Sequence, residues 1–269
     1  MYSLKGCDSI IPVLIAAARK AGAFVLRTFA PRILWRQRLS ARNWGTPDPE
    51  TKLLAFLCFR DKVSVDVGAC IGIYTMAMLC YSRACVTFEA RPNQAAELQR
   101  IFREMRAPVT VHSAALSDDT GTAQLRICRT DFGLSTISSA HTLPGDVEII
   151  TVETHRLDDY GLKNVGCIKI DAEGHEESIL MGARNTLSMS GPNIIVELDG
   201  NRNPGRIQSV RDFLKGLNYS GLFLMAGRLH PIEEFDPATA QTPGKDPYVS
   251  NFIFVQPSSR ARLPSDLLS

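Results

Sequence analysis

The sequence predicts an α/β protein built around a doubly wound, Rossmann-like sheet of seven mostly parallel strands, preceded by a helical extension. Short β-branched runs alternate with segments of helical spacing, and a glycine turn joins the first such run to the helix after it. The chain has 269 residues, 45% of them hydrophobic and 22% charged, which is enough to bury a full core. Strands separated by helices imply right-handed crossovers and therefore a parallel sheet.

The main strands follow a turn cluster at residues 43–50, which ends the N-terminal region. Apolar, β-branched runs predict strands at residues 63–67, 85–88, 109–112, 167–170, 193–198, 221–225 and 251–255. Helical spacing predicts helices at residues 51–60, 71–81, 93–106, 176–188 and 206–217. We expect three parts: a helical extension over residues 1–60, a domain over residues 61–257 and a tail over residues 258–269.

The segment 115–166 breaks this alternation of strands and helices. Residues 122–127 and 147–152 look like two extra strands, and a polar stretch rich in Gly, Ser and Thr lies between them at residues 131–139. In a doubly wound sheet, ligands bind at the carboxyl ends of the strands. We expect this insertion to lie where its loops can cover that edge.

The N-terminal region carries an uneven charge, although the net charge of the whole chain is only +2. Seven basic residues and no acid lie between Arg19 and Arg42. A solvated helix face is the plainer interpretation; a nucleic-acid or membrane surface stays open as the alternative. The longest uncharged run of this N-terminal region, residues 9–18, is about half as long as a membrane span of ~20 residues. An amphipathic helix lying on an acidic membrane surface is therefore still an option, and a spanning helix is not.

Seven cysteines are scattered through the predicted core segments. Their number is odd and no Cys-x-x-Cys pair occurs, so neither a disulfide framework nor a zinc site is indicated. We expect free thiols that pack as small apolar side chains. Free thiols are typical of a reducing compartment, and the sequence therefore predicts a cytoplasmic protein.

The turn after the first strand carries the first sign of a ligand site. Asp66 lies near the end of an apolar strand, and Gly68 and Gly72 bracket the turn into the next helix. A dinucleotide site would have a glycine at Cys70, and an aspartate would repel its pyrophosphate. An acid beside a glycine turn better suits the cationic amino and sulfonium groups of S-adenosylmethionine. A plain turn, with Asp66 capping the next helix, is the structural alternative.

A second acid favours a ligand site over a plain turn. Glu89 directly follows the second strand, about twenty residues after Gly68. A carboxylate at this point can accept two hydrogen bonds from a ribose diol. The two features together predict a nucleoside cofactor site.

Several further motifs occur in the same order as in a known family. They are Val65-Asp-Val-Gly-Ala-Cys-Ile-Gly-Ile-Tyr-Thr75, Phe88-Glu-Ala-Arg-Pro92, Ala115-Leu-Ser-Asp118, Leu157-Asp-Asp159, Ile168-Lys-Ile-Asp-Ala-Glu-Gly-His-Glu176, Ile195-Val-Glu197 and Asn251-Phe-Ile-Phe254. With these motifs, residues 64–257 resemble the FkbM family of S-adenosylmethionine-dependent methyltransferases. That family usually has Asn in place of Cys70 and Pro in place of Ala90. Residues 1–60 carry no resemblance.

The resemblance implies a class I methyltransferase fold with S-adenosylmethionine as the cofactor. It implies that Asp66, Gly68, Ala69 and Gly72 surround the methionine part of the cofactor and that Glu89 holds the ribose. It also implies that Ser117 and Asp118 lie beside the adenine, although a Ser-Asp pair is equally typical of a turn.

The block from Lys169 to Glu176 holds the candidate catalytic residues. Alternation along the strand places Lys169 and Asp171 on one side, where they can form an ion pair. The functional alternative is that Asp171, assisted by Lys169, orients or deprotonates an acceptor hydroxyl. His175 is a second candidate base, or else a helix cap. Glu197 and Asp199 could join Asp171 around magnesium, but the spacing does not require a metal and we predict none.

The favoured function is O-methylation of a hydroxyl on a small molecule or glycan. A nicotinamide-dependent oxidoreductase is disfavoured by the missing glycine at Cys70. A non-catalytic cofactor-binding or scaffold protein stays open. An RNA methyltransferase is suggested by the basic stretch at residues 19–42, which Trp35 and Trp44 accompany. We identify no regular interleaving of stacking aromatics of the kind that single-strand binders use, so a nucleic-acid partner is not expected.

Overall fold

The computed structural model describes residues 48–131, 133–139, 142–201 and 205–268. The described residues of 48–99 and 108–268 belong to one compact unit, and residues 100–107 are grouped apart from it. Most of the expected N-terminal extension, including the basic stretch and the amphipathic helix, lies outside the described residues.

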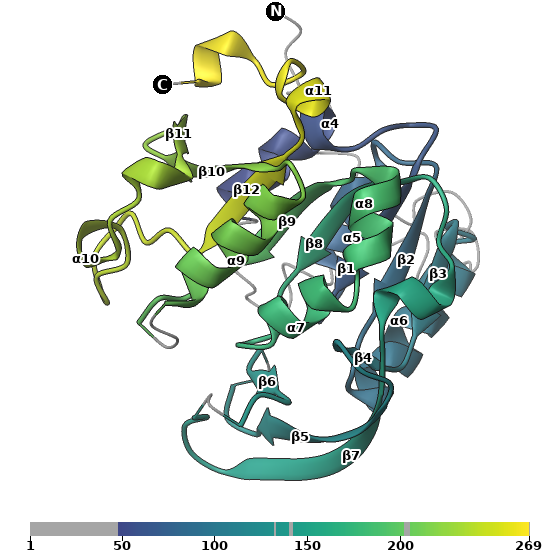
Figure 1. Ribbon diagram of the computed structural model, residues 1–269. Helices are drawn as coiled ribbons and strands as arrows, with labels where there is room; N and C mark the ends of the chain where they lie inside the picture. The colour runs from purple at the N-terminus through teal and green to yellow at the C-terminus, as the bar shows by residue number, and fades with distance from the viewer. Residues whose placement is uncertain (1–47, 132, 140–141, 202–204, 269) are drawn as a thin grey trace, which may run out of the picture. The chain divides into compact units, whose positions relative to one another are not determined.

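The main sheet confirms the predicted fold class (Figure 1). Its strand order is β11-β10-β12-β9-β8-β1-β2-β3, and all strands except β11 and β12 run in one direction. The strands are β1 (Val63–Val67), β2 (Ala84–Phe88), β3 (Val109–His112), β8 (Val165–Ile170), β9 (Asn193–Glu197), β10 (Ser220–Met225), β11 (Arg228–Pro231) and β12 (Asn251–Val255). The seven expected strands are present, and β11 adds an eighth.

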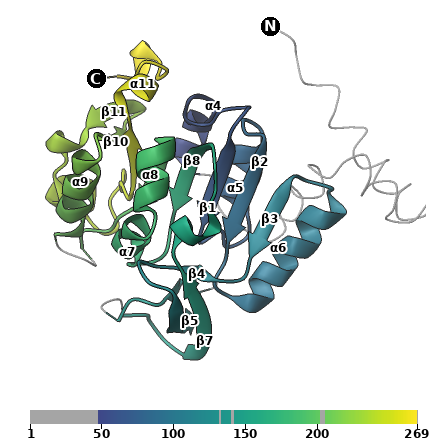
Figure 2. The ribbon, with the colours of Figure 1, turned by 45° about the vertical axis from the view of Figure 1, so that its right-hand side comes forward.

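Helices cover both faces of this sheet (Figures 1 and 2). One face packs against α7 (Glu176–Met181), α8 (Arg184–Ser190) and α9 (Arg206–Gly216), and the other against α4 (Leu54–Leu57) and α5 (Ile73–Leu79). The remaining helices are α6 (Pro92–Glu104), α10 (Pro237–Ala240), α11 (Pro257–Arg260) and the 3-10 turns η1 (Pro49–Leu53), η2 (Leu157–Tyr160), η3 (Ile232–Glu234) and η4 (Ser265–Leu267). Within the described ranges, no helix has both the length and the apolar character that crossing a membrane requires.

The helix predicted over residues 176–188 is two helices, α7 and α8. The break falls at Gly182, where an added Cβ would lie 1.9 Å from the carbonyl oxygen of Ser117. The helix predicted over residues 51–60 is also shorter than expected, because it ends at Leu57 after a 3-10 turn. Both differences come from how distant segments pack, which helical spacing does not report.

Alternation along the strands divides the core into two clusters. The α4–α5 side contains Leu54, Cys167, Ile195 and Ile253, and Leu263 from the C-terminal segment packs into the same cluster. The opposite side includes the neighbouring strand residues, for example Ile168, Ile194 and Phe252 (all at most 1% exposed). The six cysteines among the described residues are free thiols: Cys58, Cys85, Cys128 and Cys167 are buried, Cys70 is half-buried and Cys80 is exposed. Cys80, just past the end of α5, thus departs from the expected burial.

The insertion forms a second sheet with strand order β4-β7-β5-β6. Its strands are β4 (Ala115–Leu116), β5 (Gly121–Cys128), β6 (Ser135–Thr136) and β7 (Val147–His155). The two strands expected there are β5 and β7. In both views this sheet lies at the end of the main sheet where α7 begins (Figures 1 and 2). The Thr136 hydroxyl donates to the Glu173 carbonyl oxygen at 2.7 Å, which ties β6 to the loop after β8.

Candidate active site

Polar side chains gather on the α4–α5 face at the carboxyl ends of the strands. Asp66 on β1 pairs in register with Lys169 on β8, and Lys169 pairs with Ile195 on β9. Two residues further along the chain, alternation returns Asp171 and Glu197 to this face. Glu197 in turn pairs in register with Asn251 on β12. One row of the sheet therefore carries acidic and amide groups from the glycine turn towards β12.

The glycine turn brings the first strand end against this row. Gly68 has φ +76°, and a Cβ there would lie only 1.7 Å from the carbonyl oxygen of Asp171, so only glycine fits. The N–H groups of Gly68 and Ala69 both donate to the Phe88 carbonyl oxygen, at 3.0 and 3.2 Å. The N–H of Gly72 donates to the Ala69 carbonyl oxygen at 2.7 Å. The turn is thus held against β2 and β8 by the backbone.

Cys70, inside the turn, has φ +50°. This left-handed conformation is uncommon for a residue with a side chain, and Asn adopts it more readily than Cys. The Asn that the family resemblance leads one to expect at this position therefore has a backbone reason.

Asp66 is buried and turned towards α5. Its exposed fraction is 2%, and its Oδ2 accepts a hydrogen bond from the Thr75 hydroxyl at 2.5 Å. The Thr75 hydroxyl also lies 3.2 Å from that of Thr87 on β2. Burial raises the pKa of Asp66 to about 6. In this position the carboxyl group ties β1 to α5, which is close to the structural alternative for this residue.

Glu89 lies against the same turn, as its sequence position suggested. Its Oε2 accepts from the Cys70 N–H at 2.8 Å, and its Oε1 accepts from the N–H and Nε of Arg91 at 3.0 and 2.8 Å. Both side chains are buried. Burial alone would lower the pKa of Arg91, but hydrogen bonding to Glu89 raises it above its usual value. Sequence reasoning missed Arg91, although a basic residue two positions after a buried acid was a usable signal.

Ser117, Asp118 and His175 form a second polar group. The Ser117 hydroxyl donates to Asp118 Oδ1 at 2.9 Å and lies 2.9 Å from His175 Nε2. Burial lowers the pKa of His175, and the nearby Asp118 opposes that shift. The structure therefore joins one candidate base, His175, to the residues expected beside the adenine.

Lys169, Asp171 and Glu197 form the third group. The Lys169 Nζ is 3.5 Å from Asp171 Oδ2 and lies 5.0 Å from the centre of the Tyr74 ring. Burial would lower the pKa of Lys169, but the surrounding carboxylates, Asp171 first, raise it above its usual value. The charge of Asp171, together with burial, raises the pKa of Glu197 well above its usual range. With its side chain 36% exposed against 1% for Lys169, Asp171 can be reached from outside.

Three residues to which the sequence assigned no individual role complete this row. The Tyr74 hydroxyl donates to Asp48 Oδ2 at 3.1 Å, and Asn251 Nδ2 donates to the same oxygen at 3.5 Å. Asp48 lies in the predicted turn cluster at residues 43–50, and Tyr74 lies in the helix predicted over residues 71–81. Nothing local in the sequence marks them as neighbours of Lys169.

The magnesium alternative needs Glu197 and Asp199 to lie beside Asp171. Among residues 48–131, 133–139, 142–201 and 205–268, no three His, Cys, Asp or Glu side chains are arranged to hold a metal ion. Asp199 Oδ1 instead accepts from the Asn201 N–H at 2.9 Å.

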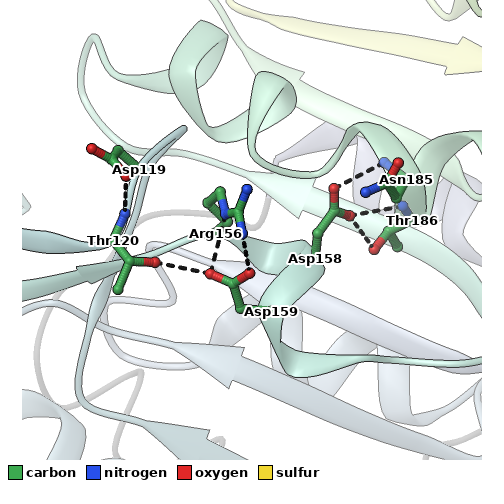
Figure 3. Close-up of polar contacts among 7 residues, drawn as sticks. All are labelled: Asp119, Thr120, Arg156, Asp158, Asp159, Asn185 and Thr186. Carbon is green, nitrogen blue, oxygen red and sulfur yellow. Dashed lines mark hydrogen bonds and ion pairs between the residues drawn. The ribbon is translucent and has the colours of Figure 1, made fainter.

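The acidic pair in Leu157-Asp158-Asp159 has a structural role (Figure 3). Asp158 accepts from the N–H groups of Asn185 and Thr186 and from the Thr186 hydroxyl, at 2.8–2.9 Å, and so caps the start of α8. Asp159 accepts from the Arg156 guanidinium and from the Thr120 hydroxyl, which joins η2 to the turn between β4 and β5. This motif therefore holds the insertion and α8 in place.

Comparison with known proteins agrees with this geometry. A family model described as "Methyltransferase FkbM domain" matches residues 66–220, more than half of the chain. No curated protein matches the chain.

Two solved methyltransferase structures match the chain at low sequence identity. The crystal structure of the methyltransferase FkbM from Methylobacillus flagellatus matches at 17% identity with a TM-score of 0.50, over 72% of this chain and 44% of that one. This chain thus spans less than half the length of that relative. An rRNA methylase from Streptococcus thermophilus matches at 8% identity with a TM-score of 0.46, over 77% of this chain and 93% of that one.

Proposed function

Because the chain belongs to the FkbM family of methyltransferases, we propose that it uses S-adenosylmethionine to methylate a hydroxyl oxygen of a small molecule or glycan. The observation that carries the proposal is the contact between the glycine turn and the end of β8. Gly68 touches the backbone of Asp171, whose carboxyl group is the exposed member of a buried charged cluster. A cofactor at the turn and an acceptor at Asp171 would therefore be neighbours.

The hydrogen-bond acceptors near the glycine turn fit a nucleoside. Glu89 binds N–H donors through both carboxylate oxygens, and a ribose diol offers hydroxyl donors of the same kind. A carboxylate has about four acceptor positions, and Cys70 and Arg91 fill them here. We infer that the guanidinium of Arg91 gives up its place to the ribose. Ser117 and Asp118 would lie on the adenine side, and the cofactor would supply a methyl group on a positively charged sulfur.

Asp171 is the group best placed to take the proton of the acceptor hydroxyl. The charge of Asp171 and burial raise the pKa of Glu197, which favours a proton on that carboxyl group and lessens the repulsion between the two side chains. Lys169 stabilises that charge from beneath the row. Lys169 and Glu197 thus act as positioning residues for Asp171. Alignment of the hydroxyl oxygen with the methyl group provides most of the acceleration in such a displacement, and a base adds to it.

Methyl-labelled S-adenosylmethionine, incubated with the protein and a panel of hydroxylated metabolites, glycans and structured RNA, tests the proposal. We expect label in a hydroxylated small molecule or glycan. Asp171→Asn should lower the transfer rate by about 10²–10⁴-fold. Binding of S-adenosylhomocysteine, measured by calorimetry, should stay unchanged. Asp199→Asn is the matched control, because Asp199 lies two residues after the end of β9 and accepts from the nearby Asn201 N–H.

Other outcomes would point to the alternatives. Label in RNA would make the protein an RNA methyltransferase. Tight binding of S-adenosylhomocysteine without transfer to any acceptor would favour a non-catalytic cofactor-binding protein. Full activity of Asp171→Asn would remove the assigned role of Asp171.

A further inference from the structure

A cavity of about 570 Å³ opens at the β12 end of the polar row. Pockets of several hundred Å³ are typical of small-molecule sites. The residues that bear on its chemistry are Asp48, Glu50, Leu53, Leu224, Tyr248 and Asn251. None of them belongs to the proposed cofactor site or to the carboxyl pair formed by Asp171 and Glu197.

The cavity adjoins the polar row, because residues in its wall also contact members of that row. Asn251, in its wall, pairs in register with Glu197. Asp48, also in its wall, accepts from Tyr74, whose ring lies against Lys169. Leu224 belongs to β10, which pairs with β12 on its other side. A ligand in this cavity would thus lie one strand away from Glu197 on β9 and two strands away from Asp171, which follows β8.

Two side chains in the cavity wall carry a buried oxygen without a hydrogen-bond partner. These atoms are Glu50 Oε2 and Asn251 Oδ1, on residues that are 5% and 6% exposed. Buried polar atoms are normally paired, so unpaired ones need an explanation. Burial also raises the pKa of Glu50. A carboxyl and an amide oxygen both accept hydrogen bonds, and a small rotation of either side chain towards the cavity would let O–H or N–H groups of a ligand satisfy them.

The other residues that line the cavity restrict the chemical class of the ligand further. Leu53, Leu224 and the ring of Tyr248 provide apolar surface. The ionisable lining residues are three acids, Asp48, Glu50 and Asp246, and one base, Lys52. Apolar surface beside hydrogen-bond acceptors suits a ring with apolar faces and hydroxyl groups around its edge. The excess of acids disfavours an anion and tolerates an amine.

We propose that this cavity binds the methyl acceptor, and that the acceptor is a sugar or similar ring polyol that is neutral or carries an amino group. The inference deepens the proposed function and rests on it for the transfer step. The site for the ring, however, can be tested without any transfer.

Binding of three matched probes to the full chain is the test: methyl glucoside, glucosamine and glucuronate, each with S-adenosylhomocysteine present, by saturation-transfer NMR. Methyl glucoside and glucosamine should bind, and glucuronate should bind about tenfold more weakly or worse. Leu224→Trp fills the cavity and should weaken both binding probes about tenfold. Met225→Trp is the matched control, because Met225 packs on the other face of the sheet and should leave binding unchanged.

A second, nearly isosteric variant keeps the proposal testable if Leu224→Trp does not fold. Glu50→Gln should reduce the preference for glucosamine over methyl glucoside by about threefold or more. Binding of none of the probes, equal binding of glucuronate, or unchanged binding to Leu224→Trp would overturn the proposal. Sugar binding without binding of S-adenosylhomocysteine in a parallel calorimetric titration would support the sugar site and overturn the proposed methyl transfer.

Discussion

The two ends of the polar row differ in how their buried polar groups are satisfied. At the β1–β2 end, Asp66 is bound by Thr75, and Glu89 by Cys70 and Arg91. At the β12 end, Glu50 and Asn251 each keep an oxygen without a partner. Both sets are buried, so the difference does not come from access to water.

This contrast separates two ways of binding. At the β1–β2 end the proposed cofactor would exchange with partners that the protein already supplies, so binding would cost part of what it gains. At the β12 end the proposed sugar would add hydrogen bonds that the protein lacks, and an unpaired buried group costs about 1–3 kcal/mol. On these proposals the first end is satisfied before binding, and the second is completed by its ligand. The following predictions test this contrast, from the largest expected effect to the smallest.

Lys169 joins the two ends, and its removal should have the largest effect. Lys169→Met leaves Asp171 and its carboxyl neighbours without the buried ammonium, and removing one partner of a buried pair costs about 3–5 kcal/mol. We expect a smaller loss at pH 5 than at pH 7.5, because the carboxyl groups can then take up protons. Urea unfolding at both pH values measures it. An equal loss at both would show that packing, and not charge, is the role of Lys169.

Asp66→Asn tests whether the buried negative charge at the β1–β2 end lowers the stability of the protein. Burial raises the pKa of Asp66 from 3.8 to about 6, so the native state binds its proton more tightly than the unfolded chain. Its contribution to the free energy of unfolding is therefore full below pH 4 and is lost as the pH rises through 6. The total loss is up to about 3 kcal/mol. Removing the charge should stabilise the protein at pH 7.5 and have little effect at pH 4. Urea unfolding curves of both proteins across this range measure the difference, and a pH-independent one would contradict the assignment.

Arg91→Met tests the exchange inferred at Glu89. Without the guanidinium, a ribose would no longer compete for the carboxylate, so affinity for S-adenosylhomocysteine should rise about tenfold, or about 1.4 kcal/mol. Calorimetric titration gives the dissociation constant, with Arg184→Met as control because Arg184 stacks on Phe213 in α9. Weaker binding to Arg91→Met would mean that Arg91 holds Glu89 ready and does not compete.

Asp158→Ala should have the smallest effect and should spare both ends. It removes the cap of α8, which typically costs about 1 kcal/mol of stability. The melting temperature should fall, while binding of S-adenosylhomocysteine and the rate of methyl transfer below that temperature stay unchanged. A loss of binding would show that η2 and α8 help to shape the cofactor site.

The strands and the glycine turn after β1 could be predicted because their signals are local. A β-branched run, a glycine at a left-handed turn and an acid one helix later depend on neighbouring residues, and each led to the correct element. The β11 strand was missed because Arg228–Pro231 is short, polar and ends in proline. The break between α7 and α8 was missed because it depends on Ser117, far away in the chain.

The sequence alone established the fold class, the family motifs and the residues of the turn, since backbone preference and hydrophobic pattern are properties of short segments. It did not establish the direction of Asp66, the Arg91–Glu89 pair or the cavity. Those depend on packing between segments, as in the contact of Asp48 with Asn251, which are 203 residues apart. Partners at that distance leave no periodic signal, because only the folded sheet brings their side chains together.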